Sequence, residues 1–125
     1  MMDQPSALEL VTAVKEFIEQ HAMPQLSGHT AFHARVAANA LGILAREIEF
    51  GPEANAAEQG RLESLLGMKG SLDELNRELC RRIRTGDIGM ATAGVGEHMR
   101  ATTMAKVAID QPSYSGFKAA QQKRS

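Results

Sequence analysis

The amino-acid sequence predicts an all-α protein, a compact bundle of four or five helices without a sheet. Three observations lead to this prediction. Apolar residues recur at helical spacing, and two capping boxes, at residues 6–9 and 71–74, mark the starts of helices. No segment alternates apolar and polar residues between turn signals, which is the pattern of a strand. The segments between the predicted helices are short, as in a helical bundle.

The capping box Ser6-Ala7-Leu8-Glu9 predicts the start of the first helix. Its helically spaced apolar residues are expected to be buried: Leu10, Val11, Val14, Phe17 and Ile18. The helix is expected to end near residues 21–23, because Pro24 disfavours a helical conformation in Met23. Residues 24–29 form a connector with Gly28 as a turn residue.

The second predicted helix runs from about Thr30 to Phe50 and stops at Gly51-Pro52, since glycine favours a left-handed cap and proline does not continue a helix. A weaker third helix is expected over residues 53–66, followed by a turn at 67–70.

The second capping box, Ser71-Leu72-Asp73-Glu74, opens an amphipathic helix that is capped by Gly86. A loop over 86–94 and a last helix over 95–109 follow. We expect residues 1–112 to form a single helical domain and residues 113–125 to be a mobile basic tail.

Composition indicates an ordinary cytoplasmic globular protein. The chain has 125 residues, 43% of them hydrophobic, and Cys80 is its only cysteine, so no internal disulfide is expected. Neither a signal peptide nor a membrane-spanning segment is recognisable. The net charge of −1 argues against nucleic acid as a partner.

Charge is distributed unevenly along the chain. Residues 1–60 carry eight acids and three bases, a balance of −5, whereas residues 61–125 carry seven acids and eleven bases, a balance of +4. Two solvated faces are the favoured interpretation. Packing of the two halves on each other, or head-to-tail association into a homo-oligomer, is the alternative.

The second predicted helix carries the candidate ligand-binding residues. On a helical projection, Arg35, Asn39 and Arg46 form a polar stripe, and His33 and Glu47 lie inside the flanking apolar arcs. These five residues are either an internal structural network, which is favoured, or a pocket for an anionic group such as the phosphate of coenzyme A or a carboxylate. In a third interpretation, His33 and Glu47 are a proton-transfer pair of an enzyme.

Arg77, Arg81 and Arg84 are candidates for docking an acidic partner. The simpler interpretation is a solvated face, with Asp73–Arg77 and Glu78–Arg82 as ion pairs at i, i+4 spacing. His29 and His33 have the spacing of metal ligands, but Thr30 stands where a zinc-protease motif has glutamate. No metal site and no cofactor are expected.

The chain resembles an uncharacterised bacterial family, one of the numbered domains of unknown function, over about residues 4–114. The matching segments are Pro5-Ser6-Ala7-Leu8-Glu9-Leu10, Phe32-His33-Ala34-Arg35-Val36-Ala37-Ala38-Asn39-Ala40-Leu41, Leu79-Cys80-Arg81-Arg82-Ile83-Arg84, and Met99-Arg100-Ala101-Thr102 through Lys106-Val107-Ala108-Ile109-Asp110-Gln111-Pro112-Ser113-Tyr114. The resemblance implies a gene neighbourhood with an aminoglycoside-phosphotransferase-like kinase and an acyl-CoA dehydrogenase. It therefore implies an accessory role in acyl-CoA or related catabolism.

Together these observations favour a non-catalytic accessory protein that binds a kinase-like or acyl-CoA-metabolising partner. A binder of small anionic ligands, acting through the polar stripe of the second helix, is the alternative. Enzymatic activity is the least favoured interpretation, because the sequence holds no recognisable catalytic constellation.

Overall fold

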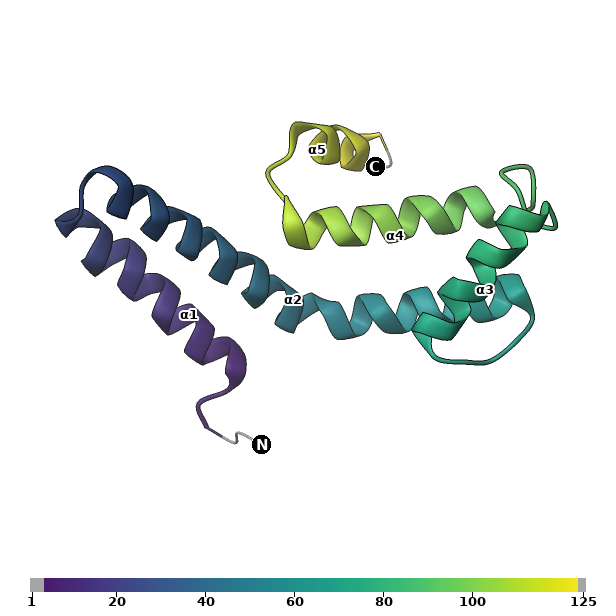
Figure 1. Cartoon of the computed structure of the whole chain (residues 1–125), viewed down its shortest axis with the longest axis horizontal. Helices are drawn as coiled ribbons and strands as arrows, with labels where there is room; N and C mark the ends of the chain where they lie inside the picture. Colours follow the sequence, from purple (N-terminus) through teal and green to yellow (C-terminus); the bar gives the residue numbers. More distant parts are fainter. Residues whose placement is uncertain (1–3, 124–125) are drawn as a thin grey trace. The chain divides into compact units, whose positions relative to one another are not determined.

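The structure, a computed structural model, describes residues 4–123 and contains five α-helices and no strand within that range (Figure 1). The predicted all-α fold class is thereby confirmed. By their internal contacts, the residues divide into two units, Met1–Gly51 (unit 1) and Pro52–Ser125 (unit 2). No helix of the described range is long and apolar enough to cross a bilayer.

Unit 1 is a helical hairpin of α1 (Ala7–Phe17) and the first part of α2 (Gly28–Leu66). The predicted capping box is present: Ser6 Oγ accepts from the backbone N–H of Glu9, and the Glu9 carboxylate accepts from the backbone N–H of Ser6, both at 3.1 Å. After α1 the chain passes through a π-helical turn (η1, Ile18–Ala22) and a 3₁₀ turn (η2, Met23–Gln25). Gly28 then adopts a φ of 61°, as expected of a turn glycine.

Small residues line the contact between the two helices of unit 1. Ala38 is 1% exposed, and Gly42 is buried at a point where an added Cβ would lie 3.2 Å from Cε of Lys15. The hairpin covers only one face of each helix. Leu10, Val14 and Phe17 are exposed, so the prediction that they are buried is wrong.

The predicted helix stop at Gly51-Pro52 is also wrong, because α2 continues through Pro52 to Leu66. Gly51 is not among the glycines of positive φ, so it is not a left-handed cap. The residue before a proline avoids the helical conformation partly because its Cβ meets the proline ring, and Gly51 has no Cβ. The alanine- and glutamate-rich segment 53–58 then favours helix. Pro52 is the first residue of unit 2.

Unit 2 has a buried apolar core. Its members come from the end of α2, from α3 (Leu72–Thr85), from the loop after α3 and from α4 (Val95–Asp110). They are Leu62, Leu66, Leu75, Leu79, Ile88 and Val95. The second capping box is present, since Ser71 Oγ accepts from the backbone N–H of Glu74 at 3.1 Å. Gly86 ends α3 with a φ of 84°, as predicted.

The last helix of unit 2 was not predicted. Within residues 113–125, expected to be a mobile basic tail, Ser115–Gln122 form helix α5. Phe117 in its first turn is buried, and Arg100 of α4 donates to the carbonyl oxygen of Ala120 at 3.1 Å. Phe117 is the only aromatic residue of the short segment Ser115–Gln122 and gives a weak helix signal, so the sequence did not predict α5. The expected single domain over residues 1–112 stays a prediction.

Candidate functional site

The five predicted ligand-binding residues lie on the part of α2 that belongs to unit 1. His33, Arg35, Asn39 and Glu47 are exposed there, and Arg46 is half-buried with its guanidinium beside Gly42. None of the five lines the groove that lies in unit 2 between the end of α2 and α4. Their role in ligand binding stays a prediction.

His33 and Glu47 are too far apart to exchange a proton. They are separated by 14 positions of one continuous helix, and a rise of 1.5 Å per residue places them about 21 Å apart along its axis. The structure therefore does not bring the proposed proton-transfer pair together. Within the described range, no three His, Cys, Asp or Glu side chains gather around a point where they could share a metal ion.

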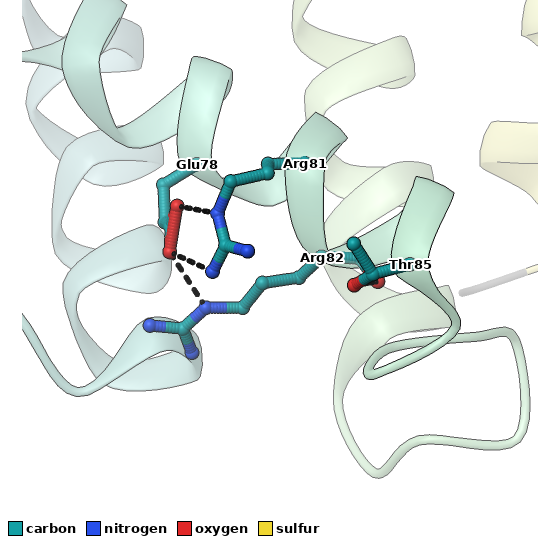
Figure 2. Close-up of polar contacts among 4 residues, drawn as sticks. All are labelled: Glu78, Arg81, Arg82 and Thr85. Carbon is teal, nitrogen blue, oxygen red and sulfur yellow. Dashed lines mark hydrogen bonds and ion pairs between the residues drawn. The ribbon is translucent and has the colours of Figure 1, made fainter.

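Three arginines of α3 pair with carboxylates of the same helix, and Figure 2 shows Arg81 and Arg82, the two that bind Glu78. Arg77 lies 3.0 Å from Asp73, and Arg82 lies 3.1 Å from Glu78, which confirms both predicted ion pairs. Arg81 also binds Glu78 in a bidentate contact: its Nε donates to Oε1 at 2.6 Å and its Nη2 donates to Oε2 at 2.9 Å. Hydrogen bonds from these two guanidiniums lower the pKa of Glu78 to about 2. Arg84 is exposed near the end of the helix. Docking of a partner at Arg77, Arg81 and Arg84 stays a prediction.

A groove in unit 2 combines polar and titratable side chains that the sequence analysis did not single out. It has a volume of about 540 Å³ and lies between the end of α2 and the first half of α4. Its lining residues are Gly60, Arg61, Ser64, Leu65, Gly94, Glu97, His98 and Ala101. We call it the Arg61 groove.

Arg61 and His98 form the polar wall of the Arg61 groove. The Nε–H of Arg61 donates to Nδ1 of His98 at 3.1 Å, and its Nη2 donates to the hydroxyl of Thr102 at 3.1 Å. Because Nδ1 accepts this bond, the proton of the neutral His98 ring resides on Nε2. Residues 61 and 98 come from different helices, so these bonds also hold α2 against α4.

The His98 ring is kept neutral by its surroundings. It is 3% exposed, and this burial is the main cause that lowers its pKa. The charge of Arg61 lowers the pKa further, whereas the charge of Glu58 opposes the shift. Glu58 is itself buried and accepts a hydrogen bond of 3.0 Å from Asn76 of α3.

Unit 1 offers a different kind of surface, two exposed apolar stripes. The α1 stripe consists of Leu10, Val14 and Phe17, which are 41%, 50% and 59% exposed. The α2 stripe consists of Phe32, Val36 and Phe50, which are 62%, 49% and 50% exposed. Residues 10, 14 and 17 share one helix face, and Phe32 and Phe50 are separated by about five complete turns, so they also share a face.

The chain belongs to the family DUF6285, described as a domain of unknown function, whose profile matches residues 24–114. The predicted resemblance to a domain of unknown function is thereby confirmed, and the gene neighbours that it implied stay a prediction. No curated protein and no solved structure matches the chain. The Arg61 groove lies inside the matched range, and α1 lies outside it.

Spacing alone could not reveal the Arg61 groove. Arg61 and His98 are separated by 37 positions, and neither belongs to a short motif. The one available signal was His98 within the predicted last helix, because an imidazole that becomes buried requires a hydrogen-bond partner.

Proposed function

We propose that this DUF6285 protein is a non-catalytic interaction protein and that unit 1 binds its partner. The single observation that carries the proposal is the exposure of the α1 and α2 stripes. The six large apolar side chains of the two stripes are exposed in the hairpin. Soluble proteins keep exposed apolar patches small, and larger ones usually mark sites of association.

The chemistry of unit 1 narrows the kind of partner. Residues 1–51 carry six acidic and three basic side chains, a balance of −3. Two such hairpins repel each other, so pairing of unit 1 with unit 1 of a second copy is disfavoured. The best match is a different protein that offers an apolar groove with a basic rim, into which one or both helices insert.

The family resemblance suggests which proteins to test first. It implies a kinase of the aminoglycoside-phosphotransferase type and an acyl-CoA dehydrogenase as neighbours. An accessory role beside one of these enzymes agrees with the absence of a recognisable catalytic motif in the sequence. Of the two, the kinase-like protein is our first choice.

Co-expression of the full chain with each neighbour, followed by size-exclusion chromatography, tests the proposal. We expect co-elution with one of them. The double substitution Phe17→Ser and Phe32→Ser should weaken the complex at least about tenfold, since buried aromatic residues dominate interface energies. Met90→Ser is the matched control, because Met90 is 74% exposed but lies in a loop of unit 2.

Separate elution of all proteins at micromolar concentration would refute the proposal. So would a complex that survives the double substitution at unchanged affinity. The isolated chain could instead form concentration-dependent dimers that the Phe17 and Phe32 variant does not form. That result would show that the stripes bind a second copy of the chain and not a different protein.

A further inference from the structure

Arg61 is a half-buried cation whose hydrogen bonds within the chain go to neutral groups. Its two acceptors are the His98 ring and the Thr102 hydroxyl. Among the described residues, no carboxylate lies within ion-pair distance of Arg61. Charged side chains are seldom withdrawn from water without an opposite charge. The wall of the Arg61 groove therefore carries a guanidinium that has no ion-pair partner in the described range.

We propose that the Arg61 groove binds a small organic monoanion and that Arg61 holds its carboxylate. A guanidinium has five N–H donors, and Arg61 uses two of them within the chain. The donors that remain on its two terminal nitrogens match the two oxygens of a carboxylate. Because His98 and Thr102 already fix the guanidinium, little conformational entropy is lost when a ligand binds.

The other groups of the groove agree with this assignment. The Nε2–H of His98 has no acceptor among the described residues, and Ser64 adds a hydroxyl to the lining. Leu65 and Ala101 supply apolar surface for a short aliphatic tail. The volume of about 540 Å³ lies in the range of small-molecule sites.

Charge in and around the groove favours a monoanion over a dianion. Glu97 lines the groove, and Glu58 is close enough to His98 to influence its titration. A phosphate dianion would meet these two carboxylates with only Arg61 to balance them. A carboxylate carries a single charge and is compensated by the one guanidinium.

Titration of the full-length protein with sodium butyrate, followed by NMR at constant ionic strength, tests the proposal. We expect saturable shifts of the His98 ring and of backbone amides at residues 60–65 and 97–101. Bound carboxylate next to the ring should also raise the pKa of His98. Butyramide, the uncharged analogue, and sodium phosphate are titrated in parallel and should bind more weakly.

Two variants and a control identify the group that holds the ligand. Arg61→Gln should weaken butyrate binding roughly tenfold or more, as expected for the loss of a charge-assisted hydrogen bond. Ser64→Phe leaves the bonds of Arg61 in place and fills the groove, so it should weaken binding even if Arg61→Gln does not fold. Arg77→Gln removes an equal charge from α3 outside the groove and should bind butyrate like the wild type.

Three outcomes would overturn the proposal. They are an absence of saturable binding by butyrate, equal affinities in the wild type and in folded Arg61→Gln and Ser64→Phe variants, and equal affinities for butyrate and butyramide. Tighter binding of phosphate than of butyrate would show that the groove takes another class of anion.

Discussion

The two units of this chain are built from helices in different ways. Unit 2 buries large aliphatic side chains, among them Leu62 and Leu75, which are fully buried, and Val95. Unit 1 buries Ala38 and Gly42 at its helix contact and leaves Phe17 and Phe32 exposed. Hydrophobic stabilisation grows with the apolar area removed from water. The comparison therefore indicates that unit 2 supplies most of the stability, whereas unit 1 leaves more of its large apolar side chains exposed.

The largest effect on the free energy of unfolding is expected from substitutions that test this difference in burial. Leu75→Ala removes a fully buried leucine from unit 2 and should lower the free energy of unfolding by about 2–5 kcal/mol, through lost burial and the cavity left behind. Leu10→Ala, at a position that is 41% exposed in unit 1, should change it by less than about 0.5 kcal/mol. Urea unfolding of the full chain measures both values. Similar losses in the two variants would contradict the comparison.

An intermediate effect is expected at the two capping boxes, because the same motif starts a helix in each unit. Ser71→Ala removes the cap of α3 and should lower the free energy of unfolding by about 1 kcal/mol. Ser6→Ala removes the equivalent cap of α1, and we expect faster hydrogen exchange of the α1 amides while unfolding of unit 2 is unchanged. If Ser6→Ala weakened unit 2 as much as Ser71→Ala does, the units would not be energetically distinct.

The smallest expected effect concerns pH and unit 2. The pKa of His98 is lower in the folded protein than its ordinary value of 6.5. The unfolded chain therefore binds more protons as the pH falls below 6.5, and stability that is fully present above this value is progressively lost. Urea midpoints of unit 2 should decrease from about pH 7.5 to about pH 5.5.

His98→Gln is the control for this prediction, since its side-chain oxygen can still accept the Arg61 bond but does not titrate. In this variant the urea midpoint of unit 2 should depend less on pH than in the wild type. An unchanged pH profile would show that His98 does not contribute to it.

Local features of the fold could be predicted because they depend on neighbouring residues. The capping boxes at Ser6 and Ser71, the cap at Gly86 and the ion pairs of α3 all follow from interactions within one or two helical turns. Gly51-Pro52 was misread because the usual stop signal assumes a left-handed glycine, and Gly51 adopts a helical conformation instead.

The buried faces were harder to predict because they depend on what lies opposite each helix. Leu10, Val14 and Phe17 have the periodicity of a core face, but only one other helix packs on α1 within its unit. The Arg61 groove was missed for a related reason. Its charged and hydrogen-bonding groups are supplied by two helices that the sequence does not show to be neighbours.

The sequence by itself determined the all-α class, the capped starts of α1 and α3 and the contacts of neighbouring turns, because these arise from local hydrogen bonding and backbone preference. The tertiary structure decided which apolar residues are covered and that Arg61 meets His98 and Thr102. Those outcomes depend on contacts between segments far apart in the chain, and helical periodicity describes one helix at a time.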